Sequence, residues 1–335
     1  MSVAARFMLL VGLLLGAALV SLNLGSFAMS PLELLTTVLG HGSAKQELAL
    51  YAIRLPRLVM AMLVGIGLAL SGAILQGISR NALADPGILG LNSGAGLAIV
   101  ALLYLQQQAI LAVPGALWPA VAFVGAMAAA IAIYLLARRQ GQVEPGRLLL
   151  AGIAINAGLS AAMLVLSMRL DRRLYDAASV WLAGSLSGAK WADVLSILPW
   201  LVCLVPLLVG LVRVLDLLGV GDATATGLGV RVEGARLALL AIAVAFAGVA
   251  VALAGAVGFV GLLGPHIARL IFGPRHGLLL PAAALIGAAL MVVSDLIGRN
   301  LLAPIELPVG VVVAVIGAPY FLYLLVRSNQ RAFAT

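Results

Sequence analysis

The residues of this chain that could do chemistry are few, and most of them stand in short polar interruptions between long apolar runs. One interruption reads SRNALADPGILG, residues 79–90. Asn81 and Asp85 can hydrogen-bond backbone groups in a turn, and Pro86 can begin a helix because it needs no N–H there. The segment therefore predicts a rigid turn, followed by a helix that starts at Pro86.

Most catalytic and metal-binding patterns are absent from the sequence. It has no G-x-x-x-x-G-K-S/T loop to hold a nucleotide phosphate. His41, His266 and His276 are scattered, without acidic residues at metal-ligand spacing, and the single cysteine, Cys203, excludes an internal disulfide. We expect no metal site, no cofactor and no catalytic residue in this chain.

Composition indicates a membrane protein. Hydrophobic residues make up 64% of the 335 residues and charged residues 10%, with a mean hydropathy of +1.19, whereas soluble domains are about half apolar and a quarter charged. About 20 apolar residues span a bilayer as a helix, and such runs recur along the chain. We predict one all-α, polytopic transmembrane domain over residues 1–335. Its ten expected spans are 7–25, 56–77, 87–105, 115–136, 148–168, 193–213, 236–255, 257–272, 278–298 and 308–326.

Lysine and arginine predict the orientation of these spans. The termini and even-numbered loops hold twelve of the twenty, and the odd-numbered loops hold eight. Cytoplasmic loops carry the excess of positive charge, so both termini are expected in the cytoplasm. The net charge of +8 is then a topological signal, and no nucleic acid is expected as a partner. Segment 30–40, SPLELLTTVLG, has the start signals of a short outer helix.

Three further features could serve a function. Cytoplasmic segment 214–235 contains LLGVGDATATGLGV, which predicts two helical turns with breaks at glycines, the second capped by Asp222. Asn156 and Ser160 share one face of the fifth span, where they could bond a neighbouring helix or line a path. Asp295 stands four residues before Arg299, which predicts an ion pair on one helix face rather than a proton-binding carboxylate.

Four segments together resemble a known family. They are 54–96, 217–230, 258–270 (GFVGLLGPHIARL) and 306–321 (ELPVGVVVAVIGAPYF). In order and spacing they resemble the permeases of bacterial ABC importers for iron-siderophores, haem and vitamin B12. The resemblance implies the type II ABC importer permease fold in the cytoplasmic membrane. It also implies three kinds of partner: a second permease subunit, identical or related, two cytoplasmic ATPases that bind ATP and Mg, and an extracytoplasmic substrate-binding protein.

The resemblance also assigns expected roles to residues of this sequence. The coupling segment that docks on the ATPase would comprise Leu218, Gly221, Asp222, Ala225, Leu228 and Gly229. Residues expected to face acidic groups of the binding protein are Arg54, Arg57 and Arg299, since guanidinium can hold a carboxylate bidentately. Residues expected at an inner constriction or along the path are Asn81, Leu83, Asn156 and Ser160.

The function expected from these features is that of a permease subunit, which is not itself an enzyme. It would pass an iron-siderophore complex through the membrane, with energy from ATP hydrolysed on a separate subunit. Haem or vitamin B12 remain alternative cargoes. An ion-coupled secondary carrier would need an acidic residue at the membrane midplane, and a membrane-embedded enzyme would need clustered histidines or carboxylates. The sequence shows neither pattern.

Overall fold

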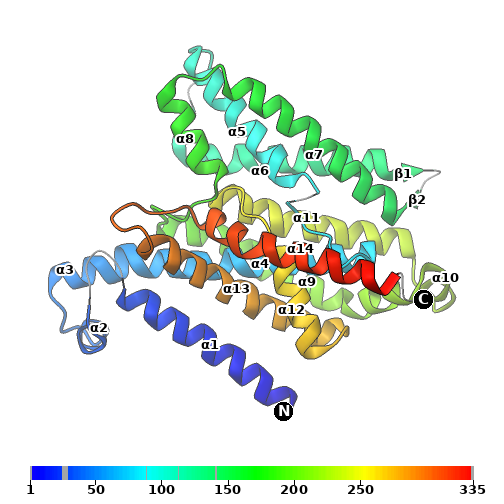
Figure 1. The fold of residues 1–335 in the computed structure, drawn as a ribbon, viewed down its shortest axis with the longest axis horizontal. Coiled ribbons are helices and arrows are strands. Elements are labelled where there is room, and N and C mark those ends of the chain that lie inside the picture. Colours follow the sequence, from blue (N-terminus) through cyan, green and yellow to red (C-terminus); the bar gives the residue numbers. More distant parts are fainter. Residues whose placement is uncertain (1, 25–28, 88, 112, 140–141, 333–335) are drawn as a thin grey trace.

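The computed structural model describes residues 2–24, 29–87, 89–111, 113–139 and 142–332. Long helices lie side by side in one bundle, as Figure 1 shows. Ten of them match the predicted spans, which confirms the all-helical, multi-span prediction. These are α1 (Val3–Asn23), α4 (Leu55–Ser79), α5 (Leu91–Gln107), α6 (Trp118–Ala137), α7 (Pro145–Ser167), α9 (Trp191–Val220), α11 (Val232–Ala254), α12 (Val260–Phe272), α13 (His276–Asn300) and α14 (Val309–Ala332).

Seven of these helices are long and apolar enough to cross a membrane unaided, and α12 and the apolar part of α14 are shorter. The remaining elements are short and join the long helices. They are α2 (Pro31–Val38), α3 (Ala44–Glu47), the π-helix η1 (Leu48–Arg54), η2 (Gly115–Leu117), β1 (Arg138–Arg139), β2 (Gln142–Val143), α8 (Arg172–Leu182) and α10 (Asp222–Gly227). Strands β1 and β2 pair antiparallel. Helices α2 and α10 lie at opposite ends of the bundle (Figure 1), and we name the two ends after them.

Helix α4 forms the centre of the bundle. In the most apolar stretch of α4, 78% of the residues are buried, and the same share is buried in α11. In α1 and α7 the buried share is 11%. An apolar helix without a polar face must be covered on all sides by protein or lipid. Helices α9, α11, α12 and α13 surround α4, so this helix is covered by protein.

Close contact around α4 depends on glycine. A Cβ atom added at Gly72 would lie 1.8 Å from the carbonyl oxygen of Gly261 on α12, and one at Gly65 would lie 2.3 Å from that of Gly287 on α13. Hydrophobic burial does not drive helix association within lipid, so helices associate there through small residues that let the backbones touch. These glycines fix how near α12 and α13 come to the central helix.

Two predicted helix limits are wrong. The helix expected from Pro86 begins at Leu91, because a further turn precedes it, in which the Leu89 N–H donates to the Asp85 carbonyl at 3.1 Å and Gly90 takes a φ of +90°. The sixth span does not end near residue 213, since α9 continues to Val220. The short helix predicted in segment 30–40 is confirmed as α2, whose Ser30 and Glu33 form a reciprocal capping box.

The glycine contact gives a stability prediction. Gly72→Ala places a methyl group against the α12 backbone, and overpacking of this kind costs about 1–3 kcal/mol. Thermal unfolding of the purified chain in detergent should therefore show a clearly lower midpoint. Gly210→Ala in α9 is the matched control, because nothing lies within 4 Å of its added Cβ. Equal midpoints for the two variants would contradict this account of the packing.

Candidate functional site

The coupling segment forms a short hairpin at the α10 end. Helix α9 ends at Val220, Gly221 adopts a φ of +137° that favours glycine, and α10 follows at once. The Val230 N–H donates to the Ala225 carbonyl at 3.0 Å and closes the return toward α11. Two predicted glycine breaks are wrong, because Gly219 continues α9 and Gly227 is the last residue of α10. Gly221 and Gly229 do mark the turns.

Asp222 does not cap α10 as predicted. It is the first residue of the helix, and no side-chain hydrogen bond caps that end. Its carboxylate instead accepts from Arg236 of α11, with both oxygens at 3.0 Å, and pairs with Arg80, which follows α4. Arg80 also donates through Nε to the Leu218 carbonyl of α9 at 2.9 Å. Helix α10 is thus bonded to α11 and to the residue after α4, and Arg80 links the same group to the end of α9.

The charge environment of Asp222 lowers the pKa of its carboxyl. Partial burial acts to raise this pKa, but the hydrogen bond and charge of Arg236, together with Arg80, outweigh it. Asp222 is therefore ionised at neutral pH, and its ion pairs hold there.

The predicted coupling residues divide into two groups by exposure. Leu218 is 1% exposed and Ala225 is fully buried, so both belong to the packing beneath α10. Leu228 is 62% exposed, and its neighbour Val220, which we had not singled out, is 70% exposed. A partner protein at this end could contact Leu228 and Val220 directly, while Leu218 and Ala225 would only hold α10 in place.

The turn predicted before Pro86 is present and well bonded. The Asn81 side-chain oxygen accepts from the Leu83 N–H at 2.9 Å, and that of Asp85 accepts from the Gly87 N–H at 2.8 Å. The turn follows Arg80, which pairs with Asp222, so it adjoins the coupling helix. Asn81 and Leu83 are half-buried here. Their role at a constriction stays a prediction.

Asn156 and Ser160 both contact Ser93 of α5. The Ser93 hydroxyl donates to the Asn156 side-chain oxygen, and the hydroxyls of Ser93 and Ser160 lie 3.1 Å apart. These side chains therefore make the interhelical bonds that were one of the two predicted alternatives. Other residues of α7 are open, among them Ile153 at 54% and Leu164 at 64% exposure.

Three arginines expected to dock a binding protein meet at the α2 end. Arg57 Nε lies 2.9 Å from Asp295, and another nitrogen of Arg57 lies 2.9 Å from Glu306. Arg299 lies 3.0 Å from Asp295, which confirms the predicted pair, while Arg54 donates to the Leu22 carbonyl of α1. We call these residues, Arg54, Arg57, Asp295, Arg299 and Glu306, the outer cluster.

Burial of the outer cluster changes how docking would work. Arg54 is 7% exposed, and the side chains of Arg57 and Arg299 are 12% and 10% exposed. The side chain of Glu306 is 46% exposed, so this residue is the most accessible part of the cluster. Sequence reasoning overlooked Glu306, although it opens one of the four resembling segments. A docking partner would meet a mixed cluster of charges rather than bare arginines.

No metal centre was expected, and the described part of the chain contains no group of three histidine, cysteine or acidic residues that could hold one. His276 instead pairs with Asp216 at 2.6 Å. Buried Gln76 of α4, also overlooked, bonds backbone carbonyls of α12 and accepts from Arg269 at 3.3 Å.

The lowered pKa of Asp222 gives a testable pH dependence. Its ion pairs stabilise the fold at pH above the ordinary aspartate value of about 3.9, and this contribution disappears as pH falls through the lower folded-state pKa. Asp222→Asn should lower the unfolding free energy by at most about 1 kcal/mol at pH 7, because the carboxylate is partly exposed. In thermal unfolding the gap from wild type should narrow below pH 4, and a gap that widens there would contradict the assignment. Asp176→Asn, on exposed α8, is the control.

Comparison with known proteins identifies a matching family and similar relatives. The model of the FecCD transport family matches residues 13–327. The chain is 44% identical over 313 residues to the iron(3+)-hydroxamate import system permease protein FhuG of Bacillus subtilis, covering 92% of this chain and 93% of that protein. It is 41% identical over 337 residues to the hemin transport system permease protein HmuU of Yersinia pestis, covering 96% and 97%.

A solved structure agrees with the sequence relatives. It is an inward-facing conformation of an ABC transporter described as of the metal-chelate type, with a TM-score of 0.85 and 27% identity, covering 97% of this chain and 99% of that one. Sequence and fold agree, and the chain belongs to the FecCD transport family.

Proposed function

We propose that this chain is the permease subunit of an ABC importer and passes a ferric siderophore complex inward across the cytoplasmic membrane. The observation that carries the proposal is the bonded coupling helix, α10, in a chain whose sequence has no phosphate-binding loop of its own. Energy must then arrive from a partner, and α10 is a rigid place to receive it. The name of the FhuG relative supports the siderophore class of cargo.

Coupling follows from the bonds of α10. A separate ATPase that closes on ATP would press on the exposed side chains Val220 and Leu228. Because Asp222 joins Arg236 and Arg80, the displacement would reach α11 and the end of α4 together. A rigid element can move long helices as a lever, which a flexible loop cannot. The turn that holds Asn81 and Leu83 lies directly beside Arg80, where an inner constriction would open or close.

The path is proposed to lie between two permease subunits, identical or related. Helices α7 and α14 leave large apolar side chains open, including Val165 at 64% and Val315 at 69% exposure. Asn156 and Ser160 would add a few neutral polar groups at the edge of this surface. Such a wall suits a bulky chelate, because conduction needs binding that is weak enough to release. The siderophore saturates its iron, so no metal ligand is required from the chain.

The outer cluster is proposed to receive the extracytoplasmic binding protein. This role requires both termini and α10 to lie on the cytoplasmic side, as the loop charges favour. Acidic groups of the binding protein would compete with Glu306 for Arg57 and with Asp295 for Arg299. Docking would thereby act on the ends of α4 and α13.

Reconstituted transport tests the whole proposal. Proteoliposomes holding this chain, its ATPase and its binding protein should import radio-iron bound to a hydroxamate siderophore only when ATP is present. Haem and labelled cobalamin are the parallel cargoes, and preferential uptake of either would replace the siderophore. Asp222→Arg should abolish uptake because it reverses the charge that meets Arg80 and Arg236. Uptake driven by a proton gradient without ATP would instead support a secondary carrier.

Docking has its own prediction, with opposite signs for two partners. Glu306→Gln releases Arg57 for an incoming carboxylate, so the binding protein should bind the reconstituted permease several-fold more tightly, while Arg57→Gln should weaken it. Surface plasmon resonance on nanodiscs measures both, and Arg173→Gln on exposed α8 is the control. Weaker binding by Glu306→Gln would mean that the glutamate itself contacts the partner and that the assignment is wrong.

A further inference from the structure

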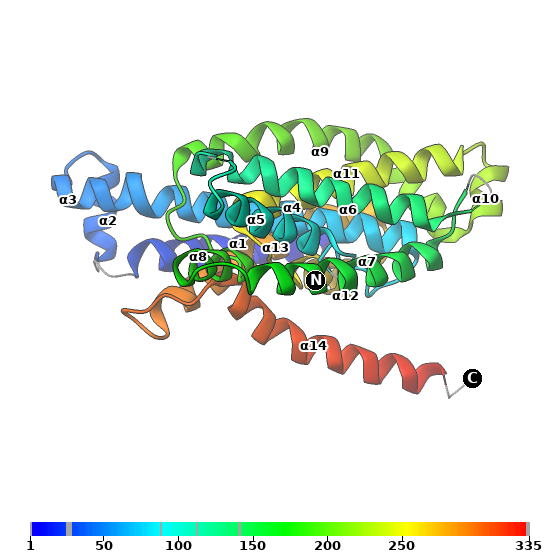
Figure 2. The same cartoon turned by 90° about the horizontal axis from the view of Figure 1, so that it is seen from above.

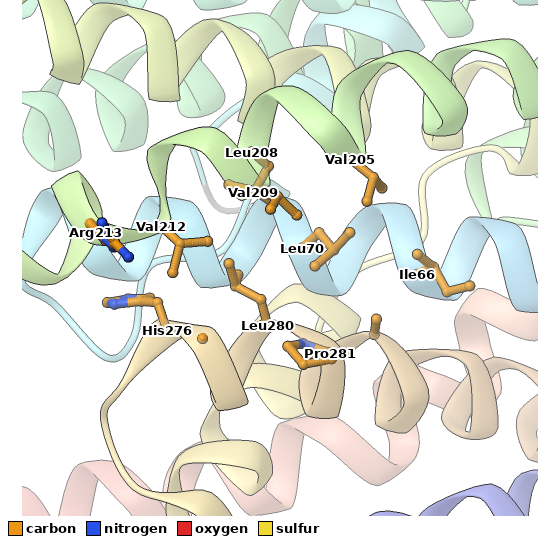
Figure 3. A pocket seen from close by; sticks show the side chains of 12 residues that line it. Ile66, Leu70, Val205, Leu208, Val209, Val212, Arg213, His276, Leu280 and Pro281 are labelled. Carbon is orange, nitrogen blue, oxygen red and sulfur yellow. The ribbon is translucent and has the colours of Figure 1, made fainter.

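Two adjoining cavities lie on the side of the bundle formed by α9 and α13. The first is an apolar groove of about 550 Å³ over α4, shown in Figure 3. Its lining includes Ile66, Leu70, Val205, Val209 and Leu280. Val209 is 65% exposed, so the groove opens on the surroundings of the bundle, which are lipid for a chain that spans a membrane. Helix α9 lies far from α14 in Figure 2, away from the proposed path.

One end of the groove carries a positively charged residue. Arg213 and His276 lie together at one end of it, as Figure 3 shows. His276 also lines the second cavity, of about 660 Å³, to which Arg80, Arg269 and Arg275 contribute. The one acidic residue of this lining, Asp216, already accepts from the backbone N–H and Nδ1 of His276 at 2.9 and 2.6 Å. An apolar groove and a pocket with an excess of cations therefore adjoin at His276.

Two buried nitrogens of residues that line this pocket have no partner among the described residues. They are Nε2 of His276, a residue that is only 5% exposed, and Nε of Arg269. The Arg269 guanidinium makes one long bond, at 3.3 Å, to Gln76. Buried polar atoms are almost always hydrogen-bonded, so these two nitrogens are exceptions in the packing around the cations.

We propose that these two cavities bind one anionic phospholipid of the cytoplasmic leaflet. An acyl chain fills the groove, and the phosphate headgroup lies among Arg213, Arg269 and Arg275. A free anion would make no use of the apolar groove, and a zwitterionic lipid would not balance the cations. Basic pockets between helices at the cytoplasmic surface are suited to anionic headgroups. The leaflet rests on the proposed orientation, whereas the site itself does not.

The site adjoins the coupling helix. Arg80, which lines the headgroup pocket, pairs with Asp222, and Gly219 and Val220 of the α9 end line the same pocket. A bound headgroup would therefore share Arg80 with α10. This contact distinguishes the proposed site from lipid that merely surrounds the bundle.

Native mass spectrometry of the full-length chain in mild detergent tests the proposal. Titration with phosphatidylglycerol should retain one lipid per chain, and phosphatidylcholine should bind at least tenfold more weakly. The double variant Arg213→Gln/Arg275→Gln should lower the phosphatidylglycerol affinity by about tenfold or more, since each surface cation contributes substantially. Arg138→Gln removes an exposed cation from β1 and should leave the affinity unchanged.

A second variant tests the groove. A Cβ added at Gly277, which lines the groove beside His276, has no atom within 4 Å, so a side chain can start there and Gly277→Trp should block the lipid. Inorganic phosphate that displaces phosphatidylglycerol completely would show a free-anion site and overturn the proposal. Equal binding of both lipids, or no effect of either variant, would overturn it too. These outcomes do not depend on transport, so they are independent of the proposed importer function.

Discussion

The structure depends on one constraint: within lipid, a polar group must find its partner inside the protein. The Ser71 hydroxyl of central helix α4 donates to the Ala243 carbonyl of α11 at 2.7 Å, and the Gln76 amide meets carbonyls of α12. Each such bond forms only if the partner backbone is close. Glycines at the contacts of α4 permit that closeness, so small residues and buried polar groups operate together.

The same constraint sends the strong charges to the two ends of the bundle. Arg57 stands near one end of α4, bound to α13 through Asp295, and Arg80 follows its other end, bound to α10 through Asp222. Between them α4 is almost wholly apolar and buried. The central helix is thus a packed rod with an ion-paired contact at each end. A permease needs such a rod if a displacement at one membrane surface is to reach the other surface, because a packed interior transmits displacement.

Much of the fold followed from local sequence, and most of the site did not. Apolar runs predicted all ten long helices, and the Asp295–Arg299 pair followed from helical spacing alone. The cap expected from Asp222 was wrong because two arginines bind its carboxylate. Arg236 lies fourteen residues later in the sequence, and Arg80 lies in a different loop. Likewise, Glu306 and Ser93 acquire their partners only when distant helices pack. No pattern within one segment reports such pairs.

The arginines of the α10 end carry information beyond topology. A positive-inside bias explains how many there are, and any position in the cytoplasmic loops would satisfy it. It does not explain why Arg80, Arg213, Arg269 and Arg275, from the ends of α4, α9 and α12 and the start of α13, converge on two cavities that share His276. Like charges repel at short range, so such a gathering is unfavourable unless something negative is held between them. Asp222 balances Arg80, and Asp216 is engaged by His276, which leaves Arg213, Arg269 and Arg275. The remaining imbalance is what an anionic headgroup would neutralise.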